Sequence, residues 1–349
     1  EKEKFFFLKN ETLPFTLSYK ENIEVEIPKL HIKLVSDQND THIFLTDLNK
    51  IKPYLPATGP IEEGGNVDIK TKDFQNFTFK GILKRSSCFL YEKNDRCKAK
   101  VSFEGKLTEN NLNFFAFNKR FHYNKAKSRI TLTNLNLDIE KFLESENKKP
   151  NKKEQKTKDK IKQSKSMIVL GKNSHLRYGD YTLITDSYDI EIKPNGTIKA
   201  IGSAQKDIIK FTKKQELISI RALRIKDKTL HPLINFKGLQ NGRYTLKVWG
   251  DPGKTMKGEI IVEGGVMKDF KAYNNALAFI NTVPALASLQ NPGYSQKGFM
   301  IEEGVAEYRM VKKDKIIFDS IYIKGTSATI AGTGEIDLKK KTINMNLAI

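Results

Sequence analysis

Hydrophobic and polar residues alternate in many short stretches of this chain, and turn-forming residues separate the stretches. Alternation with a period of two places apolar side chains on one face of a β-strand and polar side chains on the other. Strands of about five residues joined by polar turns are typical of an antiparallel meander. The pattern therefore predicts a mainly β fold. The alternating stretches are 23–27, 30–34, 77–79, 115–117, 130–139, 167–170, 181–184, 188–192, 198–201, 218–223, 244–249, 316–323 and 343–349.

One longer segment near the C-terminus has helical spacing instead. Between Phe270 and Leu289 the apolar residues recur at helical intervals, with Leu277 and Ile280 on one stripe. This spacing predicts an amphipathic helix, which Pro284 is expected to kink or break. Packing of the helix on the sheet is favoured over contact with a membrane, because most amphipathic helices pack their apolar face into the protein core. The shorter helical candidates are Thr46–Tyr54 and Asp138–Glu146.

Turn signals recur between the predicted strands. Three Gly-bearing segments, Glu62–Gly65, Val262–Gly265 and Ile301–Gly304, have strand-like flanks, and Pro194–Gly196 is a fourth turn signal. The strand–turn–strand units follow no fixed period, so they indicate a degenerate repeat.

The supply of core residues favours one extended sheet over a thick globule. Of the 349 residues only 38% are hydrophobic, and the mean hydropathy is −0.50. Residues 148–166 hold nine Lys, two acidic residues and almost no apolar residue, which indicates a solvated loop or linker. We therefore expect a first part of the sheet at 1–146, a Lys-rich linker at 147–166, and a second part at 167–349 that includes the helix at 270–289.

The formal net charge of +20 raises the question of a polyanionic partner. Clustered Lys and Arg bind nucleic acids by releasing counterions from the phosphates. In this chain, however, seven of the twenty net charges lie in residues 148–166, and elsewhere Lys alternates with acidic and apolar residues. The sequence therefore predicts no nucleic-acid partner, although a Lys-rich surface also attracts anionic lipid headgroups.

The chain has two cysteines, Cys88 and Cys97, around a predicted hairpin loop between residues 88–90 and 99–101. In an oxidising compartment they could close a cross-strand disulfide, and the alternative is two free thiols. A zinc site is not expected, because there is no second cysteine pair and no histidine nearby.

The chemistry-bearing residues form no recognisable catalytic or metal site. Gly250–Thr255 looks like a phosphate-binding loop, but Val248 stands where the Walker pattern needs glycine. The five histidines have no paired ligand spacing, and no serine lies in a Gly-x-Ser-x-Gly elbow. The sequence therefore predicts a protein that is not an enzyme, with no catalytic residue, no metal and no cofactor.

A set of motifs in residues 167–349 carries a family resemblance. Residues 328–338, ATIAGTGEIDL, closely match a Gly-x-Gly hairpin followed by an Asp-Leu pair, while residues before 167 show only a weak match at 135–139. On these motifs the chain resembles the AsmA-like family of Gram-negative bacteria, the group that contains AsmA, TamB and YhdP, in the form found in Campylobacter- and Helicobacter-type bacteria. The other matching positions are Asn235–Leu239, Gly242–Tyr244, Gly258–Ile260, Phe279–Leu286, Gly298–Phe299 and Gly304.

The resemblance implies an elongated, curved antiparallel β-sheet whose apolar inner face forms an open groove for acyl chains. It implies a periplasmic protein, anchored to the inner membrane, that carries phospholipid between the inner and outer membranes and supports envelope integrity and outer-membrane biogenesis. Such proteins are similar to the eukaryotic bridge-like lipid-transfer proteins. The expected N-terminal anchor and further C-terminal strands are not in this sequence, so we expect both ends to be boundaries within a longer protein.

Strand parity gives the candidate residues of the lipid groove. Apolar residues two apart share a face, and a shift of one residue would move the whole set to the other face. One alternative is an envelope scaffold or interaction protein that pairs with partner proteins through exposed sheet edges. A protein that binds glycans or nucleic acids is the weakest alternative, because acidic residues interleave with the lysines. The groove candidates are Ile316, Phe318, Ile343, Met345 and Leu347 in strands, with Leu277 and Ile280 facing them from the helix.

Overall fold

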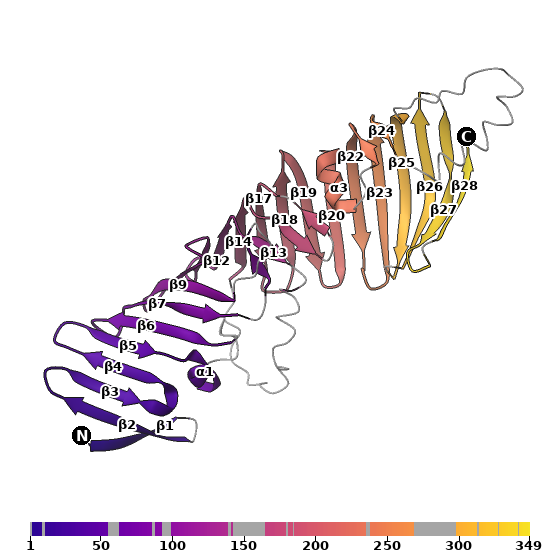
Figure 1. Cartoon of the computed structure of the whole chain (residues 1–349). Coiled ribbons are helices and arrows are strands. Elements are labelled where there is room, and N and C mark those ends of the chain that lie inside the picture. The colour runs from indigo at the N-terminus through magenta and orange to yellow at the C-terminus, as the bar shows by residue number, and fades with distance from the viewer. Residues whose placement is uncertain are drawn as a thin grey trace, which may run out of the picture. The chain divides into compact units, whose positions relative to one another are not determined.

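The computed structural model describes residues 2–8, 11–54, 63–85, 88–92, 99–138, 141, 165–178, 181–183, 185–234, 238–268, 298–312, 314–326, 328–340 and 342–349. It forms two compact units, Glu1–Gly179 (unit 1) and Asp180–Ile349 (unit 2). Both units are mainly β, as the alternation predicted (Figure 1). The division between the units falls after the predicted linker, of which residues 147–164 lie outside the described part of the chain.

Unit 1 is built around a mostly antiparallel sheet whose strands follow one another in chain order. Its elements are β1 (Lys2–Leu8), β2 (Glu11–Tyr19), β3 (Ile23–Ile27), η1 (Pro28–Leu30), β4 (Ile32–Ser36), β5 (Thr41–Leu45), α1 (Leu48–Ile51), η2 (Lys52–Tyr54), β6 (Gly65–Thr71), β7 (Phe77–Lys84), β8 (Leu90–Tyr91), β9 (Lys100–Leu107), β10 (Leu112–Ala116), β11 (Phe121–Asn124), β12 (Arg129–Thr133), β13 (Asn136–Asp138), β14 (Met167–Lys172) and β15 (Leu176–Tyr178). The sheet runs from β1 to β7 and then through β9, β10, β11 and β12, each strand antiparallel to the one before. β14 joins β12 in parallel, while β8 and β15 pair with β13 in a small separate sheet.

Unit 2 repeats this arrangement with longer strands. Its elements are β16 (Tyr181–Leu183), β17 (Ser187–Ile192), β18 (Ile198–Ala204), β19 (Asp207–Lys214), β20 (Leu217–Lys226), α3 (Asp227–Ile234), β21 (Leu239–Gln240), β22 (Arg243–Gly250), β23 (Thr255–Glu263), β24 (Val266–Met267), β25 (Phe299–Val311), β26 (Lys315–Gly325), β27 (Thr329–Asp337) and β28 (Thr342–Ala348). The antiparallel order is β17, β18, β19, β20, β22, β23, β25, β26, β27 and β28. The two-residue strand β24 pairs with β21 and with the first residues of β25.

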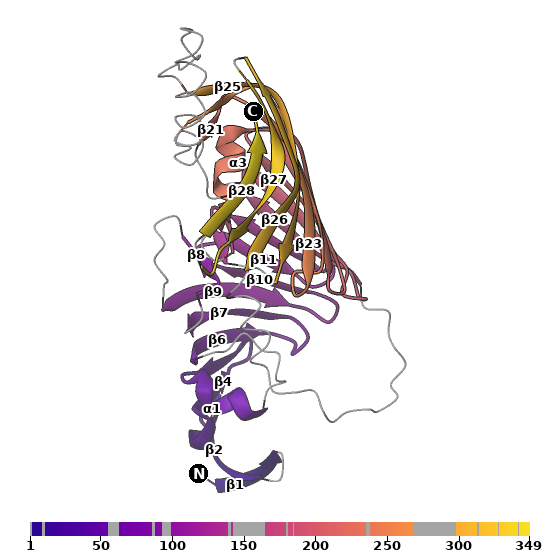
Figure 2. The ribbon, with the colours of Figure 1, turned by 90° about the vertical axis from the view of Figure 1, so that its right-hand side faces the viewer.

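The core of unit 2 lies where α3 covers one face of the sheet (Figure 2). Leu230 of α3 is 0% exposed and packs with Ile225 of β20 and Tyr244 of β22, which are also fully buried. Burying a leucine side chain of this kind contributes about 1.5–3 kcal/mol. Within the described part of unit 2, α3 is the one helix, and it covers one end of this face.

A side chain from the first residue of β19 holds the start of α3 in place. The carboxylate of Asp207 accepts hydrogen bonds from the backbone N–H of Lys226 at 2.9 Å and from the hydroxyl of Thr229 at 2.7 Å. The first N–H groups of a helix have no partner within the helix, so an acceptor at this position stabilises its N-terminus. A residue of β19 thus positions the helix that follows β20.

The structure contradicts one predicted turn and one predicted hairpin. The segment Ile301–Gly304 is not a turn but lies inside β25, where it pairs with β23 and β26 around an irregularity in register between Ile301 and Glu303. The predicted hairpin across the cysteines is also wrong. β8 pairs with β13, and β9 pairs instead with β7 and β10. Tertiary pairing over long sequence separations overrides the local turn signals in both places.

The helical predictions have mixed outcomes. Within Thr46–Tyr54 the structure forms α1 and η2, with Asp47 as the N-cap of α1. Within Asp138–Glu146, Asp138 is instead the last residue of β13, and apart from Lys141 the rest lies outside the described residues. The predicted helix between Phe270 and Leu289 lies wholly outside them and stays a prediction.

Candidate functional site

The five strand residues predicted to line a groove lie on one face of unit 2. Ile316 of β26 and Ile343 of β28 both lie opposite the same residue of β27, Ile336. Phe318 and Met345 likewise lie opposite Gly334. Residues directly opposite each other in an antiparallel pair project to the same face. The predicted parity therefore brings these side chains together.

The other three predicted groove residues are Leu347 in β28 and Leu277 and Ile280 in the predicted helix. Leu347 lies opposite Gly332 and packs against the buried cluster around α3. Ile343 is 59% exposed, whereas Met345 and Leu347 are half-buried, so this face is least covered at the first residues of β28. Leu277 and Ile280 lie outside the described residues, so their place opposite this face stays a prediction.

The same face continues through every strand of the unit 2 sheet. The register connects a row of ten facing residues, and this row together with the rows beside it on the same side is called the unit 2 apolar face. All ten residues are half-buried except Gly258, which is buried. The row consists of Ile190, Ala200, Phe211, Ile220, Val248, Gly258, Tyr308, Phe318, Gly334 and Met345.

Unit 1 has a corresponding face, which sequence reasoning did not identify as a site. A row of apolar residues, interrupted by one glycine, crosses ten consecutive strands from β2 to β12, and every member is half-buried. This row and its neighbours on the same side are called the unit 1 apolar face. The signal was present in the sequence as the same period-two alternation. The row consists of Leu17, Val25, Leu34, Ile43, Ile69, Phe79, Gly105, Phe114, Tyr123 and Ile130.

Large side chains lie over strand glycines on the unit 1 apolar face. A Cβ atom on Gly81 would lie 2.8 Å from Cζ of Phe103, and one on Gly105 would overlap the ring of Phe79. Phe103 also stacks on Phe114, with ring centroids 5.5 Å apart, and lies 6.1 Å from Phe79. The glycines therefore make room for an aromatic cluster that forms part of this face.

In unit 2 an aromatic side chain also lies over a strand glycine. The Tyr308 ring lies over Gly258 of β23, so a Cβ atom there would overlap Cζ, Cε1 and the hydroxyl oxygen. The Tyr308 and Phe318 rings are neighbours, with centroids 6.1 Å apart. Burial raises the pKa of the Tyr308 hydroxyl above its usual value of 10.0. This tyrosine thus presents an un-ionised ring to the apolar face at neutral pH.

The opposite face of each sheet carries ion pairs, and in unit 2 it also holds exposed apolar side chains such as Ile201, Trp249 and Tyr322. In unit 2, Nζ of Lys247 lies 2.8 Å from Oε1 of Glu259, and Arg309 makes a two-pronged contact with Asp319 at 2.7–3.0 Å. The Arg309 guanidinium lowers the pKa of the Asp319 carboxyl. These pairs are largely exposed, so each contributes little to stability. These charged side chains of unit 2 thus lie on the face opposite the apolar row.

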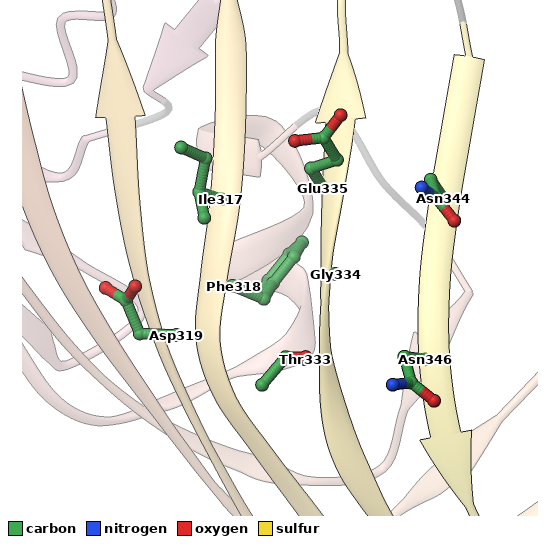
Figure 3. Close-up of a pocket in the computed structure, with 8 residues that line it drawn as sticks. All are labelled: Ile317, Phe318, Asp319, Thr333, Gly334, Glu335, Asn344 and Asn346. Carbon is green, nitrogen blue, oxygen red and sulfur yellow. The ribbon is translucent and has the colours of Figure 1, made fainter.

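Two depressions, one in each unit, are formed by strand residues, and the lining of each contains both polar and apolar residues. One of about 380 Å³ is lined by side chains of β26, β27 and β28, among them Asp319, Glu335 and Asn344 (Figure 3). Asp319 is held by Arg309, and Glu335 pairs with Lys315 at 2.6 Å. Both carboxylates are thus already neutralised, so this depression offers no acid–base pair for catalysis.

Three further predictions concern the two cysteines, a metal site and a membrane-spanning helix. Cys88 is disulfide-bonded, while Cys97 lies outside the described residues, so the pairing of these two cysteines stays a prediction. Within the described part of the chain, no three His, Cys, Asp or Glu side chains gather as a metal site would require. Across the same residues, no helix has the length and apolar character needed to cross a bilayer.

Comparison of the chain with protein-family models, with curated proteins and with solved structures finds no match.

Proposed function

We propose that the protein binds the acyl chains of phospholipids along its apolar faces and transfers lipid between the inner and outer membranes. The observation that carries the proposal is the continuity of each face. Half-buried apolar side chains follow one another through ten strands in unit 1 and through ten in unit 2, with glycines as the only gaps in the two described rows.

A continuous half-buried apolar row is unusual for a surface that faces water alone. Monomeric proteins rarely expose large contiguous apolar patches, and larger ones mark sites for ligands, proteins or membranes. Burying one methylene group contributes about 0.8 kcal/mol, so ten methylenes contribute on the order of 8 kcal/mol before the entropic cost of ordering the chain. Acyl chains on these faces would therefore bind with useful affinity.

The length of the unit 1 row suits acyl chains that lie across the strands. Neighbouring strands are about 4.8 Å apart, so a row through ten strands is about 40 Å long. The hydrocarbon core of a bilayer is about 30 Å thick and holds two layers of acyl chains. More than one acyl chain thus fits along the row, and the uniform lining offers no single position at which a chain is held much more tightly than elsewhere.

Irregular register supports the curved sheet that a groove requires. β20 and β22 shift register between Ala222 and Ile225, and β26 shifts against both β25 and β27 near Phe318. Such β-bulges bend a strand and increase its local twist. We propose that these irregularities curve the unit 2 sheet around its apolar face, as an open groove demands.

The proposed location is the periplasm, with an anchor in the inner membrane. The disulfide at Cys88 supports an oxidising compartment, because disulfides persist there and are rare in the cytoplasm. In the AsmA-like family, which the chain resembles, this location goes with lipid transport for outer-membrane biogenesis.

Lipid extraction followed by mass spectrometry tests the proposal. The protein is purified without detergent from a Gram-negative host, and the variant pair Ile343→Asp with Leu347→Asp is compared with Asn344→Asp with Asn346→Asp. Both variants add two charges to β28, the first on the apolar face and the second on the polar face. We expect phospholipid in the wild type and the polar-face variant, and much less in the apolar-face variant. A folded, lipid-free wild type would instead mean that these faces are a dry core.

One observation favours a second candidate function, an envelope scaffold that pairs through its sheet edge. Among the residues that the structure describes, β28 pairs with β27 alone, and Thr342–Ala348 contains neither a charged residue nor proline. Natural edge strands usually carry such residues to prevent pairing with other chains. A lipid-free protein that forms complexes lost in an Asn344→Pro variant would support this candidate over lipid transfer.

A further inference from the structure

The face of unit 2 opposite its apolar face, called the outer face, carries a stripe without charged residues. The stripe follows the register of the sheet from β19 to β27. Three of its large side chains, Ile208, Leu223 and Tyr322, are 52%, 66% and 40% exposed. A continuous stripe with exposed apolar side chains is typical of a surface that binds a partner. The uncharged stripe consists of Ile208, Leu223, Thr245, Ile261, Val305, Tyr322 and Ala331.

A charged row runs along each side of the uncharged stripe. In both rows the side chains up to β22 are basic, and those on β23 and β25 are acidic. The sign of the charge thus changes between β22 and β23 in both rows. The first charged row consists of Lys210, Arg221, Lys247, Glu259 and Glu307, and the second of Lys226, Arg243, Glu263 and Glu303.

This order places like charges next to each other within the sheet. Lys210, Arg221 and Lys247 lie opposite one another in successive strands, and so do Glu259 and Glu307. Like charges directly opposite each other in an antiparallel pair are destabilising. The stability of a single sheet therefore does not explain the arrangement.

Ion pairs within unit 2 neutralise part of the two rows. Lys247 pairs with Glu259, and Arg224 at the bulge of β20 pairs with Glu263. The other charges of the two rows make no ion pair within the described part of the chain, and most of their side chains are exposed. They are Lys210, Arg221, Lys226, Arg243, Glu303 and Glu307.

We propose that unit 2 binds a second copy of this chain through its outer face, with a two-fold axis that runs parallel to the strands between β22 and β23. Such an axis places β22 over β23 of the second copy and β20 over β25 of the second copy. The basic half of each charged row then faces the acidic half of the same row. Arg221 faces Glu307 of the second copy, and Lys226 faces Glu303 of the second copy. The charges that lack an ion pair in one copy are thus paired across the interface.

The apolar residues of the stripe obey the same symmetry. On β20 and β25 the axis brings Leu223 to Val305 of the second copy, and on β22 and β23 it brings Thr245 to Ile261 of the second copy. An isologous interface requires a surface that is complementary to itself in this way. The inference goes beyond the proposed function, because a contact through the outer face leaves the unit 2 apolar face of each copy free.

The expected contact is small and centred on the axis. Sheets packed face to face cross at about 30°, so the match weakens away from the axis. At the next positions of the second row, Lys206 in the turn before β19 and Lys324 of β26 are both basic, and the match ends there. Strands β19 to β26 and the three rows cover roughly 25 by 20 Å, or about 500 Å² on each copy. An interface of this size and charge should dissociate on dilution and in high salt.

The test is the oligomeric state of the full chain, measured by sedimentation velocity over a concentration series. The variants Arg221→Glu and Glu307→Arg are studied alone and as an equimolar mixture. In either variant alone, like charges meet at both symmetry-related contacts, whereas in a heterodimer of the two variants both contacts are attractive. Because β22 and β23 separate positions 221 and 307 by about 14 Å within one chain, a rescue in the mixture must come from pairing between copies. Lys214→Glu, at the exposed end of β19, is the control with the same change in net charge as Arg221→Glu.

We expect the wild type and Lys214→Glu to dimerise with similar affinity, and each of the two other variants to dimerise at least about tenfold more weakly. The mixture should recover an affinity close to that of the wild type. Thermal unfolding at low concentration should show Arg221→Glu to be at least as stable as the wild type, because the substitution interrupts a row of like charges.

A wild type that stays monomeric at every concentration would overturn the proposal, and so would a mixture that associates no better than its two components. A dimer that persists in both variants but is lost in Asn344→Pro would place the contact at the β28 edge instead of the outer face.

Discussion

Replacing Gly258 by alanine places a methyl group where the Tyr308 ring lies. The three atoms nearest to the added Cβ all belong to the Tyr308 side chain, so the tyrosine must move. Overpacking of this kind costs about 1–3 kcal/mol. Alanine recovers about 0.5–1 kcal/mol relative to glycine inside a strand. The net loss in the free energy of unfolding is therefore about 0–2.5 kcal/mol.

The size of the effect is measurable by thermal unfolding. For a protein unit of this length, 1 kcal/mol corresponds to about 2–4 °C in Tm, so Gly258→Ala lowers Tm by up to roughly 10 °C. Gly304→Ala is the matched control in the neighbouring strand β25. The nearest atom to a Cβ there is the backbone oxygen of Tyr322 at 3.3 Å, a tight contact without the overlap seen at Gly258, so we expect a smaller loss than at Gly258.

A double-mutant cycle with Tyr308→Ala makes the prediction sharper. Without the ring, the three atoms nearest to the methyl group at position 258 are gone, so Gly258→Ala should lose its destabilising effect or become stabilising by up to about 1 kcal/mol. In the single variant the displaced ring loses burial, and the raised pKa of Tyr308 should fall back toward 10.0. If Gly258→Ala has the same effect with and without the ring, Tyr308 does not cover the glycine and the register of the apolar face is wrong.

Three further predictions address the core and the cap of α3. Leu230→Ala should lower the free energy of unfolding by about 2–5 kcal/mol in urea denaturation, because it opens a cavity at a fully buried position, and a loss below 1 kcal/mol would place Leu230 outside the core. Asp207→Ala should cost about 1–3 kcal/mol and speed amide exchange in α3, because the Thr229 hydroxyl and a backbone N–H lose their acceptor, whereas unchanged exchange would refute the cap. Burial, with the charge of Asp227 as a second cause, raises the pKa of Tyr244 to about 12. Because this acid stays protonated in the fold while the unfolded chain ionises near pH 10, stability is fully present below pH 10 and falls between pH 10 and 12. An ultraviolet titration in which every tyrosine ionises near pH 10 would contradict it.

The alternating pattern was enough to predict the fold class and the side of each C-terminal strand that carries Ile316, Phe318, Ile343, Met345 and Leu347. Period-two spacing fixes which residues of a strand share a face, and in an antiparallel meander the next strand along the chain is also the next in space. Local sequence therefore contained the information for the parity and for most of the strand order.

Pairing between distant segments could not be predicted in the same way. Glu302 and Glu303 next to Gly304 have the composition of a turn, yet β25 continues through them because β23 and β26 pair with it on both sides and Lys324 neutralises Glu302. The parallel pairing of β12 with β14 depends on a connection that returns across many residues, which no local pattern encodes. The same holds for the pairing of β8 with β13.

The unit 1 apolar face was missed for a different reason. Its strands show the same alternation as the C-terminal strands, but the family motifs lie after residue 167 and directed the choice of groove residues there. Only the register between strands shows that Val25, Leu34, Ile43 and Ile69 form one row.

Photoaffinity labelling with a phospholipid that carries a diazirine in its acyl chain tests the central claim most directly. After irradiation, peptide mass spectrometry identifies the labelled residues in each unit. We expect labels on the two apolar faces, at positions such as Ile343, Met345 and Phe318 in unit 2 and Ile43 in unit 1. The intervening residues Asn344 and Asn346 should carry no label. Labels that fall on the polar faces, or a folded protein that takes up no label, would contradict it.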